Sequence, residues 1–122
     1  MSKKILVVDD SAVMLMSVKE ALEMAKYVVH TAKDGLEAFI ALQGGLRPDL
    51  VITDINMPNM NGLEFIKNAR TILRFTPILA LTTESQAVKR DEAKKLGATG
   101  WLVKPVAGPD LLRVIKQVLP GA

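Results

Sequence analysis

The chain has 122 residues, of which 49% are hydrophobic and 24% are charged, and its formal net charge is +3. This length and composition are typical of one folded domain with its own hydrophobic core, and they exclude a disordered chain. The absence of cysteine excludes disulfides, thiolate metal sites and cysteine nucleophiles, and the mixing of basic with acidic residues argues against the clustered basic face of a nucleic-acid-binding protein.

The first predicted element is a strand at residues 5–8. Its apolar run stops at Asp9 and Asp10, which is too soon for the core of a signal peptide. No later run approaches the length of a membrane span. We therefore expect a cytoplasmic protein without a membrane partner.

Short β-branched runs alternate with longer segments of helical periodicity along the whole chain, a pattern typical of βαβ units around a parallel sheet. The predicted strands are residues 5–8, 27–29, 50–53, 78–81 and 101–103. The predicted helices are residues 12–24, 36–42, 63–72, 86–96 and 109–119. The sequence thus predicts an α/β fold, a single doubly wound (βα)5 domain over residues 1–122 with a five-stranded parallel sheet.

The first predicted helix carries apolar residues at helical spacing after Ser11, a residue suited to capping the helix N-terminus. Met14, Met16 and Met24 fit the core-facing side of this helix, where methionine commonly fills gaps. We therefore assign these methionines no function.

Polar side chains follow four of the predicted strands, at the edge where open parallel sheets bind ligands. They are Asp9 and Asp10 after the first strand, Asp54 after the third, Thr82 after the fourth and Lys104 after the fifth. Taken singly, each residue has an ordinary structural explanation, such as capping a helix or closing a turn. Capping does not explain their joint placement after four different strands, which favours a functional site.

The three carboxylates would repel one another, and a divalent cation would relieve that repulsion. The available ligands are hard oxygens, which suit Mg²⁺ better than zinc or copper. We predict Asp10 and Asp54 as side-chain ligands. Lys104 would pair with Asp54 at rest and with phosphoryl oxygens after reaction, and Thr82 would donate a hydrogen bond to the same oxygens.

A more specific signal comes from four segments, residues 7–11, 54–62, 81–84 and 97–105. Their order and approximate spacing resemble the response-regulator receiver family, and within it the single-domain regulators of chemotaxis. The resemblance spans nearly the entire chain and implies a flavodoxin-like version of the predicted fold.

The resemblance also implies the chemistry. Asp54 would accept a phosphoryl group from a chemotaxis-type histidine kinase, in a reaction that requires Mg²⁺. The implied site residues are Asp9, Asp10, Asp54 and the backbone carbonyl of Asn56 around Mg²⁺, with Thr82 and Lys104 against the phosphoryl group. A cis peptide bond is implied between Lys104 and Pro105, where proline reduces the preference for trans.

A switch is implied as well, in which Thr82 moves toward the phosphoryl group and Trp101 turns inward. Trp101 stands where the family often has Tyr or Phe, and without the resemblance it would be interpreted as a packing residue. Asn56 and Glu84 occupy positions where family members tune the access of water to the acyl phosphate. Their identities predict a short-lived phosphorylated state.

The predicted partner face joins the fourth helix, the fifth strand and the fifth helix. Its predicted residues are Arg90, Lys94, Trp101 and Val103. The sequence stops soon after the last predicted helix, so we expect no output domain and a monomer that signals through protein contact. The expected partner is the flagellar motor switch or another phosphotransferase, and a phosphorelay intermediate and a phosphate-sink receiver are the alternatives.

Two other classes of protein compete with this interpretation. A hydrolase of the haloacid dehalogenase type requires a second aspartate two residues after the nucleophile, where this chain has Asn56. A nucleotide-binding domain requires glycines after the first strand, where the acidic residues 9–12 would repel phosphate. We therefore predict a signalling domain that catalyses only its own phosphorylation and dephosphorylation, not an enzyme.

Overall fold

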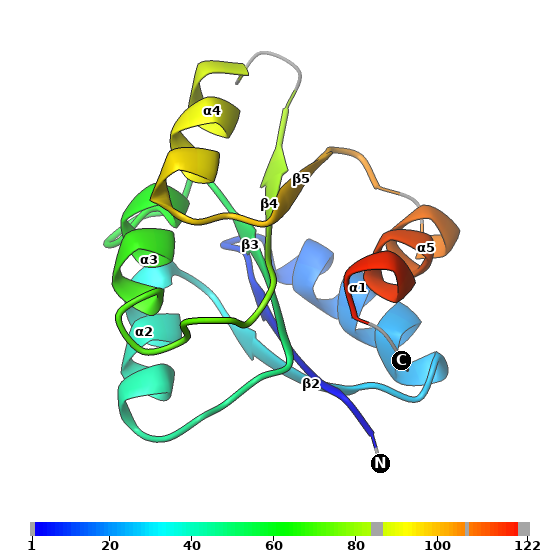
Figure 1. Cartoon of the computed structure of the whole chain (residues 1–122). Helices are drawn as coiled ribbons and strands as arrows, with labels where there is room; N and C mark the ends of the chain where they lie inside the picture. The colour runs from blue at the N-terminus through cyan, green and yellow to red at the C-terminus, as the bar shows by residue number, and fades with distance from the viewer. Residues whose placement is uncertain (1, 84–86, 107, 120–122) are drawn as a thin grey trace.

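A computed structural model of the chain describes residues 2–83, 87–106 and 108–119, in which five strands and five helices alternate (Figure 1). The strands are β1 (Lys4–Val8), β2 (Val28–Ala32), β3 (Leu50–Asp54), β4 (Ile78–Thr82) and β5 (Gly100–Val103). The helices are α1 (Ala12–Met24), α2 (Gly35–Gln43), α3 (Gly62–Ala69), α4 (Ala87–Leu96) and α5 (Gly108–Val118). Within the described part of the chain, no helix has the length and apolar character needed to cross a membrane.

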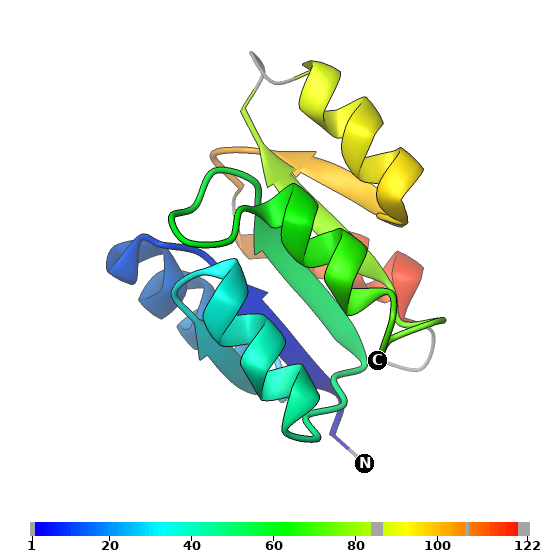
Figure 2. The ribbon, with the colours of Figure 1, turned by 90° about the vertical axis from the view of Figure 1, so that its left-hand side faces the viewer.

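The strands form one parallel sheet in the order β2-β1-β3-β4-β5. Helices α1 and α5 cover one face of this sheet, and α2, α3 and α4 cover the other (Figures 1 and 2). The predicted doubly wound (βα)5 fold is therefore confirmed.

Each central strand contributes alternate residues to two separate cores. In β1, Leu6 and Val8 pack under α2 and α3, whereas Ile5 and Val7 pack under α1 and α5. Side chains of successive strand residues point to opposite faces of a sheet, so a strand covered on both faces is apolar almost throughout. The first, third and fourth strands are accordingly almost continuous apolar runs in the sequence.

Two element boundaries differ from the prediction by more than two residues. The second strand was predicted at residues 27–29, but β2 runs from Val28 to Ala32, because an edge strand pairs on one side only and tolerates the exposed His30 and Thr31. The third helix was predicted to reach residue 72, but α3 ends at Ala69. The chain turns there because the Arg70 guanidinium binds backbone carbonyls of the segments that follow, those of Leu73, Thr76 and Gly97.

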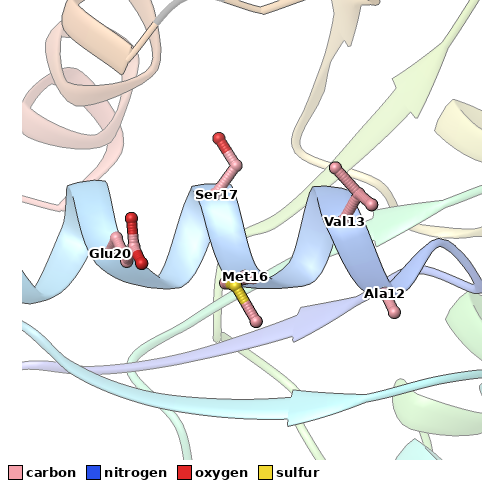
Figure 3. Close-up of a pocket in the computed structure, with 5 residues that line it drawn as sticks. All are labelled: Ala12, Val13, Met16, Ser17 and Glu20. Atoms are coloured by element: carbon pink, nitrogen blue, oxygen red, sulfur yellow. The ribbon is translucent and has the colours of Figure 1, made fainter.

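The predicted core-facing position is wrong for Met16 and Met24, whose exposed fractions are 65% and 82%. The side of α1 that packs against the sheet is formed by Leu15, Val18 and Leu22. Met16 lies with Val13 along a shallow apolar hollow on the outer side of the helix (Figure 3). The helix carries apolar residues on more than one side, so its periodicity alone does not select the buried one.

The loop between β3 and α3 packs closely against the end of β3 and is also bonded to the start of α2. Gly62 opens α3, and a side-chain carbon there would collide with the backbone oxygen of Asp54, so only glycine allows this approach. Earlier in the loop, the Asn59 amide donates to the Asp34 carboxylate at 2.7 Å. Hydrogen bonds from the Glu37 backbone N–H and from Asn59 lower the pKa of Asp34. The loop that follows Asp54 is thereby fixed to the N-terminus of α2.

Candidate functional site

The candidate site lies at the carboxyl ends of the central strands. Asp9 directly follows β1, Asp54 is the last residue of β3, Thr82 is the last residue of β4, and Lys104 directly follows β5. The strand order reverses direction between β1 and β3, and open α/β sheets bind ligands at such a switch point. The fold therefore brings together residues that are up to 95 positions apart in the sequence.

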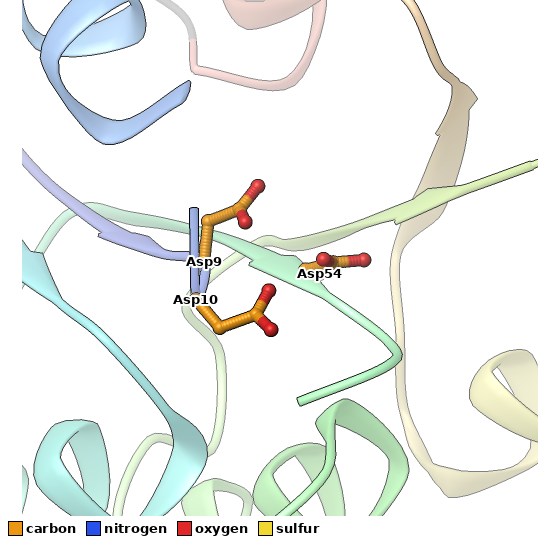
Figure 4. A group of neighbouring side chains, drawn as sticks. All are labelled: Asp9, Asp10 and Asp54. Atoms are coloured by element: carbon orange, nitrogen blue, oxygen red, sulfur yellow. The ribbon is translucent and has the colours of Figure 1, made fainter. Parts of the chain in front are cut away.

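Three carboxylates gather at this edge, from Asp9, Asp10 and Asp54, with one oxygen of each lying within 4.8 Å of the others (Figure 4). Asp9 and Asp54 are buried, whereas Asp10 is exposed. Backbone N–H groups orient the two buried groups: Ser11 donates to Asp9 Oδ1 at 2.9 Å, and Ile55 donates to Asp54 Oδ1 at 2.7 Å. The other oxygen of each, Oδ2, accepts a hydrogen bond from Lys104.

Lys104 bridges the two buried carboxylates. Its Nζ lies 3.0 Å from Asp54 Oδ2 and 3.1 Å from Asp9 Oδ2. The peptide bond between Lys104 and Pro105 is cis. A single ammonium does not neutralise three carboxylates, so the metal-free cluster keeps an excess of negative charge.

The pKa values of Asp54 and Lys104 are shifted by burial and by the charges around them. Burial raises the pKa of Asp54 above its ordinary value of 3.8, and the hydrogen bond and charge of Lys104 offset only part of that rise. Burial alone would lower the pKa of Lys104, but its bonds and charge interactions with Asp54 and Asp9 together raise it. Since Asp54 ionises with more difficulty in the folded state, its ionisation costs stability. That cost is absent below pH 3.8 and is complete once the pH exceeds the folded-state pKa.

Thr82 and Trp101, the two residues predicted to form the switch, have contacts of a different kind from those of the carboxylates. Thr82 is fully buried, and its hydroxyl lies 3.5 Å from the Leu102 carbonyl, which is a long contact for a hydrogen bond. Trp101 is 41% exposed, and the Arg90 guanidinium carbon lies 5.3 Å from the centre of its ring, within cation–π range. Glu84, the predicted tuning residue, lies outside the described residues.

Within the predicted partner face, Arg90 stacks on the ring of Trp101. Lys94 is exposed on α4, and Val103 is half-buried at the end of β5. In the described part of the chain, β5 lies at the edge of the sheet and pairs with β4, and the partner face stays a prediction.

The residues present fit Mg²⁺. Every side-chain ligand in the acidic cluster is a carboxylate oxygen, and two carboxylates with waters are the usual protein contribution to a magnesium site. The exposed Asp10 leaves the cluster open to solvent, through which a hydrated cation would enter. The Asn56 carbonyl stays a predicted ligand.

One contact of the site was not anticipated from the sequence. The Lys89 Nζ donates to Asn56 Oδ1 at 2.7 Å, which connects α4 to the loop after β3. Lys89 is one of several lysines on α4, and no spacing in the sequence distinguishes it from the others. Only the placement of α4 over the end of the sheet identifies it.

Together, the fold and the site define a doubly wound α/β domain with a lysine-paired acidic cluster at its switch point. The family model of the response regulator receiver domain matches residues 5–116. The chain belongs to this family.

Relatives and solved structures agree with that assignment. The chain is 38% identical to the chemotaxis protein CheY1 of Helicobacter pylori over 97% of both proteins. It is 36% identical to the response regulator MprA of a Mycobacterium species, covering 98% of this chain but 51% of MprA.

Among solved structures, the chemotaxis protein CheY4 of Vibrio cholerae superposes with a TM-score of 0.91 at 46% identity, covering 98% of this chain and 100% of the other. The receiver domain of a sensor histidine kinase from Pseudomonas aeruginosa superposes with a TM-score of 0.88 at 25% identity, covering 98% of each chain. That structure holds a magnesium ion in its active site cleft.

The repulsion within the cluster predicts the effect of Asp10→Asn. This change removes one of three crowded charges, so we expect the metal-free protein to gain about 1 kcal/mol in free energy of unfolding. Mg²⁺ stabilises the wild type by binding the folded state, and we expect this stabilisation to shrink in the variant. Urea unfolding with EDTA and with Mg²⁺ measures both effects.

The matched control is Asp91→Asn, which removes the same charge from an exposed position on α4. We expect this control to leave both quantities within about 0.5 kcal/mol of the wild type. Equal behaviour of the two variants would contradict an electrostatically strained metal site.

Proposed function

We propose that this receiver domain is a phosphorylatable response regulator that accepts a phosphoryl group on Asp54 from a histidine kinase. The observation that carries the proposal is the geometry of Asp54, which is fixed by Ile55 on one oxygen and paired with Lys104 on the other. A buried carboxylate held in this way is oriented for attack, and a cation already lies beside it.

In the proposed reaction, an oxygen of Asp54 attacks the phosphorus of a phosphohistidine. A new P–O bond forms, the P–N bond breaks, and its electron pair returns to the imidazole of the donor. The Lys104 ammonium keeps its charge and moves from the carboxylate to a phosphoryl oxygen, where negative charge is spread in the transition state. The buried Thr82 hydroxyl supplies a further hydrogen bond to that group.

Mg²⁺, when bound, would neutralise charge on the phosphoryl oxygens. Asp10 and Asp54 would hold it directly, with Asp9 and the Asn56 carbonyl completing the predicted ligand set. Asp9 also has a second role in the proposal, because its contact with Lys104 keeps the ammonium at the site when Asp54 is modified.

A phosphohydrolase of the haloacid dehalogenase type is less well supported. Asn56 lies two residues after Asp54, and its amide does not act as a general acid or base in the way a second aspartate does. The domain would therefore store the phosphoryl group for a time rather than turn over external substrates, and would catalyse only its own phosphorylation and dephosphorylation.

We further propose a role in chemotaxis, with the flagellar motor switch as the partner and the cytoplasm as the location. The support is the similarity to CheY1 and CheY4 over nearly their full lengths. The proposed output is phosphorylation-dependent binding by a monomer at the face that includes Arg90 and Trp101. A phosphorelay intermediate or a phosphate sink is the alternative.

The phosphoacceptor assignment predicts that Asp54→Asn does not take up phosphate, because an amide is a poor nucleophile. With acetyl phosphate and Mg²⁺, we expect the wild type to gain one phosphate per chain by intact-protein mass spectrometry. Asp91→Asn should behave like the wild type. One phosphate per chain on the Asp54→Asn variant would show that the assignment is wrong.

The proposed switch predicts a change in the fluorescence of Trp101, the only tryptophan. Beryllofluoride with Mg²⁺ mimics the phosphoryl group, and we expect it to reduce quenching by acrylamide because the exposed ring turns inward. Thr82→Ala should weaken this response while beryllofluoride still binds. Unchanged quenching of the wild type under saturating beryllofluoride would refute the rearrangement.

The two partner hypotheses are separated by a binding assay. We expect beryllofluoride-activated protein to bind a flagellar motor switch peptide at least about tenfold more tightly than the resting protein, which corresponds to a coupling free energy of roughly 1.4 kcal/mol. A histidine phosphotransferase domain serves as the competing ligand. Binding to the phosphotransferase alone would favour the phosphorelay alternative.

A further inference from the structure

The hydrogen bond between Lys89 and Asn56 crosses the rim of the candidate site. Lys89 lies near the start of α4, and Asn56 lies two residues after Asp54 in the exposed loop that follows β3. The 2.7 Å between Lys89 Nζ and Asn56 Oδ1 is the length of a strong, charge-assisted hydrogen bond. The two residues are 33 positions apart, so the contact depends on the tertiary fold.

The chemical consequence concerns the Asn56 amide. Its carbonyl oxygen is the only strong acceptor of that side chain, and its nitrogen offers only donors. A water that approaches Asp54 from this side would be oriented best by donating to that oxygen. Lys89 donates to one of the two lone pairs of this oxygen, so the amide is turned toward α4.

The start of α4, where Lys89 lies, makes a second contact, with the sheet. Lys89 is half-buried, and the next residue, Arg90, stacks on the Trp101 ring of β5. The start of α4 therefore contacts both the loop after β3 and the edge strand. The bond between Lys89 and Asn56 is exposed, so we expect it to contribute as a modest surface contact.

We propose that Lys89 is a positioning residue that slows hydrolysis of the phosphorylated state by holding the Asn56 amide away from the attacking water. This inference rests on the proposed function of Asp54. In the step that is slowed, the water oxygen bonds to phosphorus and the bond from phosphorus to Asp54 breaks. The electron pair returns to the Asp54 carboxylate, and the protons of the water leave with inorganic phosphate or pass to solvent.

The test follows loss of phosphate after acetyl phosphate and Mg²⁺ have labelled the protein and excess donor has been removed. We expect Lys89→Ala to shorten the lifetime of the phosphorylated state roughly three- to tenfold, the effect of losing one modest hydrogen bond. Lys89→Arg should retain most of the wild-type lifetime, since a guanidinium also donates to the amide oxygen. Lys95→Ala, which removes an exposed lysine from the last turn of the same helix, should leave the lifetime unchanged.

A double-mutant cycle separates positioning from a general effect of charge or folding. Asn56→Ala removes the amide but keeps the backbone carbonyl, so Lys89→Ala should have no further effect in that background. A wild-type lifetime in Lys89→Ala, or an equal shortening in the Asn56→Ala background, would overturn the inference. Failure of the wild type to take up any phosphate would instead overturn the proposed function, and the inference with it.

Discussion

The ion pairs of Lys104 with Asp54 and Asp9 are the interaction on which the rest of the site depends. Both carboxylates are buried, and a buried carboxylate without a partner would carry a large desolvation cost. The partner has to come from the end of β5, two strands away from β3 in the sheet. The order of the strands therefore brings the lysine to the two buried carboxylates that need it.

Lys104 does not neutralise all the negative charge of the cluster. One ammonium serves two buried carboxylates, and the exposed Asp10 adds a third charge to the cluster. Such a site is less stable than an apolar or neutral one would be, a trade that proteins make where binding is needed. Burial raises the pKa of Asp54, the charge of Asp9 adds to that rise, and Lys104 offsets only part of it.

The fold and most of the cluster could be predicted from the sequence for a simple reason. Strands buried on both faces leave continuous apolar runs, and the polar residues that end those runs must meet at one edge of a parallel sheet. The prediction failed where no such pattern exists. Nothing in the periodicity of α1 distinguishes the buried Leu22 from the exposed Met16, and the edge strand β2 mixes exposed and buried residues.

The same reasoning explains why Lys89 was missed and why α4 matters for the properties of this particular chain. Asp9, Asp54 and Lys104 are fixed by the ends of strands, whereas a residue on a covering helix reaches the site only through the exact placement of that helix. Consecutive residues of α4, Lys89 and Arg90, contact the loop after Asp54 and the ring of Trp101. Side chains of successive helix residues point about 100° apart, so neighbouring residues of one turn can contact two different segments of the chain. Helix α4 therefore contacts both the loop that follows the proposed phosphoacceptor and the proposed switch residue.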